Sequence, residues 1–142
     1  MNILVVDGMG GGLGKAIIEK IKDICKDNAI LAVGTNSHAT SIMLKAGAVF
    51  GATGENAIIY NCKKADIIIG AIGILLADSM LGEISPQIAI AVSSSPAEKI
   101  IISVPQCNVT IAGLPDASLS QYLDELPFLL KKALLKTTKN HV

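Results

Sequence analysis

The sequence predicts a three-layer α/β sandwich of the Rossmann-like type, with a mostly parallel sheet of five to six strands. Short β-branched apolar runs alternate along the chain with stretches in which apolar residues recur every three or four positions. A cluster of glycines joins the first apolar run to the first helical stretch. Apolar residues make up 51% of the 142 residues, which indicates a sheet buried on both faces or an apolar patch covered in an oligomer. The length fits a single domain over residues 1–142.

The first half of the chain contains four expected strands and three expected helices. The run NILVVD has the composition of a strand buried on both faces. After the glycines, Leu13, Ile17 and Ile21 recur at helical spacing with charged residues between them. Strands are expected at residues 2–7, 29–33, 48–50 and 66–69, and helices at residues 13–26, 37–45 and 55–64.

The second half continues the alternation with less regular spacing. Ser85 followed by Pro86 is a strong helix start, because Ser caps a helix and Pro suits its first position. Pro127 is expected to kink or restart the last helix. The expected elements are a helical turn at residues 74–81 closed by Gly82, a helix at 86–92, a strand at 99–104, a candidate sixth strand at 108–112, a helix from Ser118 and a frayed tail at 138–142.

The charges limit the partners that the chain can have. Its 12 basic residues, all of them Lys, balance 12 acidic residues, so we expect neither nucleic acid nor an acidic membrane as partner. The longest apolar run covers residues 67–77, whereas a membrane span needs about 20 residues. Cys25, Cys62 and Cys107 are widely spaced and odd in number, which indicates reduced thiols, a cytoplasmic protein and no metal site.

The glycine cluster is the strongest functional signal. Gly8, Gly12 and Gly14 have the G-x-x-x-G-x-G spacing of a phosphate-binding loop between a strand and a helix. Glycine lets the backbone approach a ligand closely, and the helix that follows directs free N–H groups at an anion. The run also resembles a P-loop, but Ala16 stands where the Mg²⁺-binding hydroxyl belongs. A turn required only for tight packing is the alternative. The expected phosphate-binding residues here are Gly8, Gly10, Gly11, Gly12, Gly14 and Lys15.

Other polar residues follow later strands and are expected at the same edge of the sheet. The second strand ends without the acid that usually binds an adenosine ribose, which favours NADP over NAD, although no Arg is present for the extra phosphate. Further candidate cofactor-binding residues are Thr35, Asn36, Ser37, Thr53, Asn56, Gly70 and Gly73. Asp78, Ser79 and Glu83 follow a little later in the chain.

Candidate catalytic groups are few. His38 and Glu55 are the best acid–base candidates by chemistry, and Asp7 lies beside the expected phosphate loop. Tyr60 and Lys64 have the Y-x-x-x-K spacing of short-chain dehydrogenases, but they fall on the wrong helix and we interpret the match as a coincidence.

Four runs together resemble a small family of conserved bacterial proteins known as a domain of unknown function. They are residues 7–17, 34–41, 51–58 and 77–83. The resemblance implies a single Rossmann-like domain and supplies no reaction. The first strand–helix unit is also similar to short-chain dehydrogenases, which implies nucleotide binding more than hydride transfer.

The sequence therefore predicts a protein that binds a phosphorylated ligand, a nucleotide or dinucleotide with NADP first, and that forms a homodimer or higher homo-oligomer. A small NADP-dependent oxidoreductase is one alternative. An oligomeric structural or regulatory protein without a nucleotide is the other.

Overall fold

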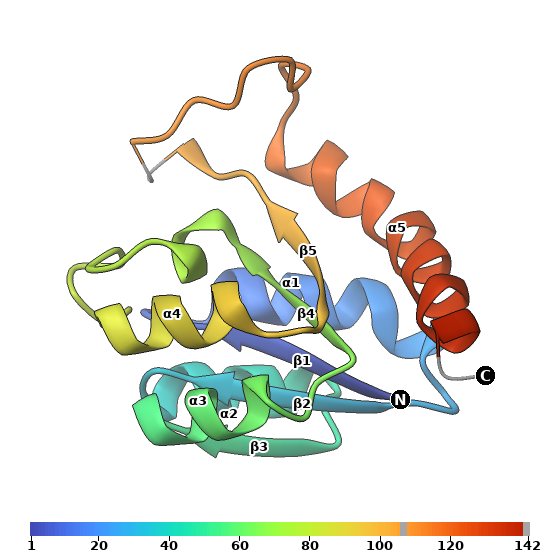
Figure 1. Ribbon diagram of the computed structural model, residues 1–142, viewed down its shortest axis with the longest axis horizontal. Helices are drawn as coiled ribbons and strands as arrows, with labels where there is room; N and C mark the ends of the chain where they lie inside the picture. Colours follow the sequence, from blue (N-terminus) through green and yellow to red (C-terminus); the bar gives the residue numbers. More distant parts are fainter. Residues whose placement is uncertain (106–107, 141–142) are drawn as a thin grey trace.

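One five-stranded sheet forms the centre of the molecule (Figure 1). The computed structural model describes residues 1–105 and 108–140. The strands lie in the order β3-β2-β1-β4-β5 and every pairing is parallel. They are β1 (Asn2–Asp7), β2 (Ala29–Gly34), β3 (Phe50–Thr53), β4 (Ile67–Ala71) and β5 (Glu98–Ile102).

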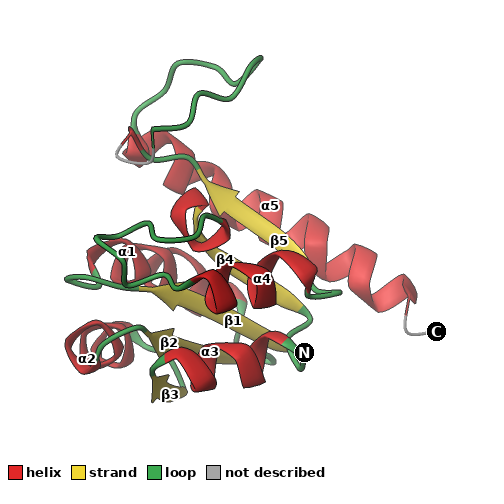
Figure 2. Ribbon diagram, turned by 60° about the vertical axis from the view of Figure 1, so that its left-hand side comes forward, coloured by secondary structure: helices red, strands yellow, loops and turns green. Residues whose placement is uncertain are grey.

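Helices cover both faces of the sheet (Figure 2). The first face carries α1 (Gly12–Ile21), α2 (Ser37–Ala46) and α5 (Leu119–Asn140). The second face carries α3 (Glu55–Cys62) and α4 (Pro86–Ser94). The described residues also include the short 3₁₀ turns η1 (Lys22–Ile24) and η2 (Ile72–Leu75). The predicted three-layer α/β sandwich is confirmed.

Alternation along the strands divides the core in two. Ile3 and Val5 of β1 join the cluster under α1 and α5, whereas Leu4 and Val6 join the cluster under α3 and α4. All four side chains are buried, as expected for a strand covered on both faces. Burial of each such side chain contributes about 1.5–3 kcal/mol. The buried sheet explains much of the apolar surplus in the composition.

The C-terminal part contradicts the sixth strand and one of the two effects expected at Pro127. Residues 108–112 are not a strand, because β5 is the last strand of the sheet and Val109 and Ile111 stay exposed beyond it. Helix α5 runs through Pro127, so the restart is ruled out, whereas a kink at the proline stays a prediction. Leu123 and Leu130, on either side of the proline, bury in the same core cluster, and this packing outweighs the lost backbone hydrogen bond.

Several boundaries differ from the expectation. α1 ends at Ile21 and passes into η1, so the helix is shorter than predicted. β3 begins at Phe50, where its backbone pairs with Leu31 of β2, instead of ending there. α5 continues to Asn140, so the described part of the expected frayed tail is helical, and His141 and Val142 lie outside the described residues.

Candidate functional site

The sheet reverses its winding between β1 and β4. The chain proceeds from β1 outward to β2 and β3, and then β4 pairs with β1 on its other side. In parallel α/β sheets, ligands bind beyond the carboxyl ends of the strands at such a switch point. Two segments meet there, the glycine loop that follows β1 and the segment that follows β4 (Figure 1).

Three glycines of the loop are required by the fold. A Cβ atom on Gly8 would lie 2.6 Å from Oγ1 of Thr35, and one on Gly14 would lie 2.8 Å from Cγ of Met43. Gly11 is the N-cap of α1 and has a φ of 72°, a left-handed conformation that favours glycine. Packing therefore accounts for part of the glycine pattern.

Packing does not account for Gly10 and Gly12. A Cβ atom on either residue would meet no described atom within 4 Å, and neither residue has a left-handed φ. Both residues line a pocket. Their backbone N–H groups, and that of Leu13, have no acceptor among the described residues. A Cβ atom at Gly10 or Gly12 would therefore meet open space.

The Asp7 carboxylate holds the glycine loop by hydrogen bonds to its backbone. Its side chain is buried, with Oδ1 accepting the N–H of Gly8 at 2.8 Å and Oδ2 accepting the N–H of Gly14 at 2.7 Å. Burial raises the pKa of the Asp7 carboxyl, the two backbone hydrogen bonds oppose that rise, and the charge of Glu83 adds to it. Both carboxylate oxygens thus hold the loop.

Glu83 joins the glycine loop to the end of β2 at the carboxyl edge of the sheet. Its Oε1 accepts the hydroxyl of Thr35 at 2.6 Å and the side-chain amide of Asn36 at 2.7 Å, and both carboxylate oxygens lie 3.1 Å from the N–H of Met9. The hydrogen bond from Thr35 lowers the pKa of Glu83, burial opposes this, and the bonds from Asn36 and Met9 reinforce it. The remote carboxylate therefore ties the glycine loop to the end of β2.

We call residues 76–83 the strap, because they run from the end of η2 to Glu83 across the edge of the sheet. Asp78, Met80 and Leu81 have positive φ values of 64°, 54° and 56°. Such conformations cost about 1–3 kcal/mol each in residues other than glycine. Local hydrogen bonds hold them, including the 2.7 Å bond from the N–H of Asp78 to the carbonyl of Ile84 and the bond from the Ser79 hydroxyl to the carbonyl of Gly73.

A pocket of about 730 Å³ opens between the glycine loop, the strap and the end of β5. Its volume lies in the range of small-molecule sites, and its wall is mainly apolar with a few polar groups. From the loop side it is lined by Asp7, Gly8, Met9, Gly10, Gly11, Gly12 and Leu13. The other side is formed by Ala71, Leu76, Ala77, Asp78, Ser79, Met80, Leu81, Val104, Asn108 and Leu119.

The structure brings together only part of the residue set expected from the sequence. Gly8, Gly10, Gly11 and Gly12 line the pocket with Asp7. Gly14 lies buried beneath the loop, and Lys15 is exposed on α1.

The polar candidates after β2 and β3 do not line the pocket. Thr35 and Asn36 are bonded to Glu83, and Thr53 is bonded to the hydroxyl of Thr40 at 2.8 Å. Ser37, His38, Glu55 and Asn56 are exposed first-turn residues of α2 and α3. Gly70 and Gly73 are buried and are not among the residues that line the pocket.

The sequence signal for the opposite wall was weak. Asp78 and Ser79 of that wall, like Glu83 outside it, stand out in the sequence only as polar residues after the fourth strand. The apolar wall residues, such as Leu76, Val104 and Leu119, carry no signal that distinguishes them from core residues.

Tyr60 and Lys64 lie away from the pocket. The Lys64 ammonium donates to the Tyr60 hydroxyl and lies 4.2 Å from the centre of the Tyr60 ring. The Lys64 carbonyl accepts a hydrogen bond from the side-chain amide of Asn2, the first residue of β1. Lys64 therefore lies at the amino ends of the strands, opposite the carboxyl ends where the pocket opens.

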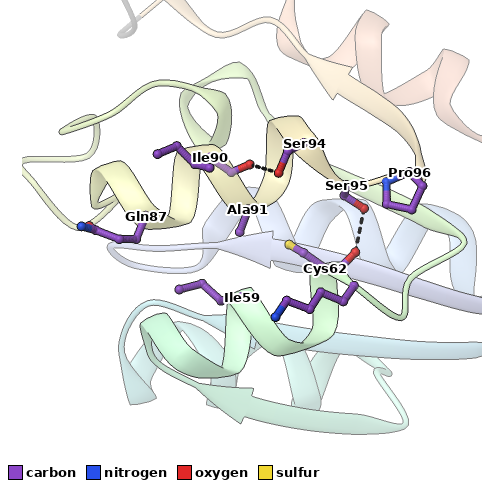
Figure 3. A pocket seen from close by; sticks show the side chains of 9 residues that line it. Ile59, Cys62, Gln87, Ile90, Ala91, Ser94, Ser95 and Pro96 are labelled. Carbon is purple, nitrogen blue, oxygen red and sulfur yellow. Dashed lines mark hydrogen bonds between the residues drawn. The ribbon is translucent and has the colours of Figure 1, made fainter.

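A second hollow of about 320 Å³ lies between α3 and α4 (Figure 3). Ile59, Ile90 and Ala91 form much of its apolar lining. Ser94 donates to the Ile90 carbonyl at 2.5 Å and Ser95 to the Cys62 carbonyl at 2.6 Å. These two serine hydroxyls are occupied by backbone carbonyls of the protein itself.

The remaining chemistry of the described residues is limited. Cys25 and Cys62 are free, buried thiols, and burial raises the pKa of each to about 11. Cys107 lies outside the described residues. Within residues 1–105 and 108–140, no three His, Cys, Asp or Glu side chains are grouped to hold a metal ion. In that same part of the chain no helix combines the length and apolar character needed to cross a membrane.

The chain belongs to the family described as a domain of unknown function (DUF3842), whose sequence pattern matches residues 2–134. This match confirms the expected resemblance to such a family, whereas the likeness to short-chain dehydrogenases stays a prediction. No curated protein matches. Among solved structures, the chain is similar to a dodecameric FMN-dependent UbiX-like decarboxylase from Escherichia coli O157:H7. The two share 14% identity and a TM-score of 0.44, over 94% of this chain and 76% of that one.

Proposed function

We propose that this protein binds a phosphorylated small molecule of the nucleotide class in the β1–β4 pocket. The phosphate contacts the backbone N–H groups of Gly10, Gly12 and Leu13, and the body of the ligand lies against the apolar wall. The observation that carries the proposal is the pair Gly10 and Gly12, because their lack of side chains serves neither packing nor a left-handed turn. Free N–H groups at the start of a helix are the groups that hold an anion in such sites.

NADP, the first ligand expected from the sequence, takes a lower place in this proposal. The second strand itself ends without an acid, which favours NADP, but the Glu83 carboxylate lies beside Thr35 at that end. A carboxylate repels the extra phosphate of NADP, and the chain has no Arg to offset the repulsion. A nucleotide without that phosphate fits better.

Binding is preferred to catalysis. Of the candidate acid–base groups, Asp7 holds the loop with both oxygens, and His38 and Glu55 lie outside the pocket lining. A small oxidoreductase remains the second candidate only because Asp78 and Ser79 line the pocket. Assembly into homo-oligomers is supported by exposed apolar residues such as Phe128 and Leu135. A cytoplasmic setting is supported by the two free thiols.

The test is a thermal-shift panel of NAD, NADP, FAD, ATP and inorganic pyrophosphate. A ligand at one hundred times its Kd stabilises the folded protein by about 2.7 kcal/mol, which is visible as a raised melting temperature. Gly12→Val should abolish the shift and leave the melting of the free protein nearly unchanged. Ser120→Val, at an exposed first-turn residue of α5, is the matched control. If no phosphate compound shifts the wild-type protein, the structural or regulatory alternative without a nucleotide replaces this proposal.

A further inference from the structure

The end of β2 is where a dinucleotide site receives the second half of its ligand. In this protein, side chains already occupy that place. Glu83 accepts hydrogen bonds there from Thr35 and Asn36, and Asn36 also donates to the Met9 carbonyl at 2.9 Å. A Cβ atom on Gly8 would lie 3.0 Å from the Met80 sulfur, which shows how closely the strap covers the loop on this side.

Charge, like the filled space, opposes a phosphate on the β2 side of the loop. Glu83 accepts three donors, which stabilise its ionised form. The chain has no guanidinium group to neutralise a ligand phosphate, and among the described residues no Lys is hydrogen-bonded to Glu83. A second phosphate directed toward β2 would meet the Glu83 carboxylate.

The other side of the loop has room for one ring system. The pocket of about 730 Å³ extends from Gly10 and Gly12 toward Leu76, Val104 and Leu119. Apolar side chains in such a wall suit a flat heteroaromatic body, while Asp78 and Asn108 supply polar contacts.

We infer that the site takes a mononucleotide-sized ligand, one phosphate and one ring body directed toward β4 and β5, and that Glu83 excludes the second half of a dinucleotide. The inference rests on the proposed phosphate site and deepens it by naming the ligand class. Glu83 acts here as a specificity-determining residue, since its carboxylate fills and charges the β2 side of the edge.

The experiment compares matched pairs of ligands by titration calorimetry. FMN and FAD share one half, as do nicotinamide mononucleotide and NAD. In at least one pair, the wild-type protein should bind the mononucleotide at least about tenfold more tightly than the dinucleotide, because space and like charge oppose the added half. Glu83→Ala should reduce that preference toward one, and Glu83→Gln, which keeps the shape but removes the charge, should reduce it partly. Glu125→Ala, an exposed glutamate on α5, should leave it unchanged.

Three results would overturn the inference. If each dinucleotide binds the wild-type protein as tightly as its mononucleotide, the inferred selectivity is contradicted, but the proposed phosphate site is not. A preference that survives in both Glu83 variants removes the role of Glu83. Absence of binding by all four compounds and by inorganic pyrophosphate removes the proposed function and this inference together. The ratio of dinucleotide to mononucleotide Kd is measured on the wild-type protein, so it tests the selectivity even if a variant fails to fold.

Discussion

The two halves of the carboxyl edge of the sheet differ in kind. Between β1 and β2 the groups are polar and joined to one another, with Glu83 bonded to Thr35, Asn36 and the loop. Between β1 and β4 the surface is mainly apolar and open, and the backbone N–H groups of Gly10 and Gly12 have no acceptor in the described structure. Polar residues after a strand therefore indicate a ligand site only when the protein does not satisfy them itself.

The largest expected effect separates the two kinds of glycine in the loop. Gly14→Ala forces a Cβ atom against Met43 and Asp7, so we expect a loss of about 1–3 kcal/mol in unfolding free energy. Gly12→Ala has open space and should change stability by less than about 0.5 kcal/mol or raise it slightly. Urea unfolding of both variants measures the difference. Equal destabilisation by the two would mean that packing explains the whole glycine pattern.

Removing the carboxylate beneath the loop should have the next largest effect. In Asp7→Asn only the side-chain oxygen remains to accept the N–H groups of Gly8 and Gly14, because the side-chain NH2 group can only donate. One buried N–H without a partner costs about 1–3 kcal/mol. Asp116→Asn, an exposed position, serves as the control in the same urea experiment. A loss no larger than that of the control would show that the loop keeps its form without Asp7.

Weakening the hydrogen bonds of Glu83 on the β2 side should lower the unfolding free energy by less. Glu83→Gln keeps the shape of the side chain and weakens its charged hydrogen bonds to Thr35, Asn36 and Met9. Because Glu83 is only partly buried, we expect a loss of about 1 kcal/mol in unfolding free energy. Hydrogen exchange should also become faster at the amides of the strap and of Met9. Unchanged exchange there would mean that the strap is held by its own backbone bonds.

The smallest effect is a difference in pH dependence between the two carboxyl groups. The pKa of Glu83 is lowered in the folded protein, so its stabilisation is present above its ordinary pKa of 4.5 and is lost as the pH falls through the folded value. The pKa of Asp7 is raised, so its contribution is fully present below its ordinary 3.8 and is lost as the pH rises through the folded value. On acidification, the destabilisation caused by Glu83→Gln should shrink while that caused by Asp7→Asn grows. Unfolding free energies at several acidic pH values give both slopes, and slopes of the same sign would contradict this assignment.

Local signals explain the parts of the fold that the sequence predicted well. β1 has the predicted limits because its apolar run is bounded by a polar residue and the glycines. α2 begins at the predicted residue because Asn36 caps it, accepting the N–H of Ala39 at 2.9 Å. The glycine loop lies between β1 and α1 as predicted, because its glycines suit the turn that joins this strand to this helix.

Long-range contacts explain the parts that the sequence did not predict. Glu83 meets Thr35 across 48 residues of sequence, and no local pattern encodes that contact. The left-handed residues of the strap, such as Met80 and Leu81, have no sequence preference for that conformation. Pro127 has a strong local preference to interrupt a helix, which packing on both sides overrides.

An NMR titration of ¹⁵N-labelled protein with inorganic pyrophosphate tests the central claim most directly, because it reports on both halves of the edge at once. The account predicts that the amide signals of Gly10, Gly12 and Leu13 shift most, while those of Thr35 and Asn36 shift little. Saturable shifts centred on Thr35 and Asn36, or no saturable shift in the loop, would contradict it.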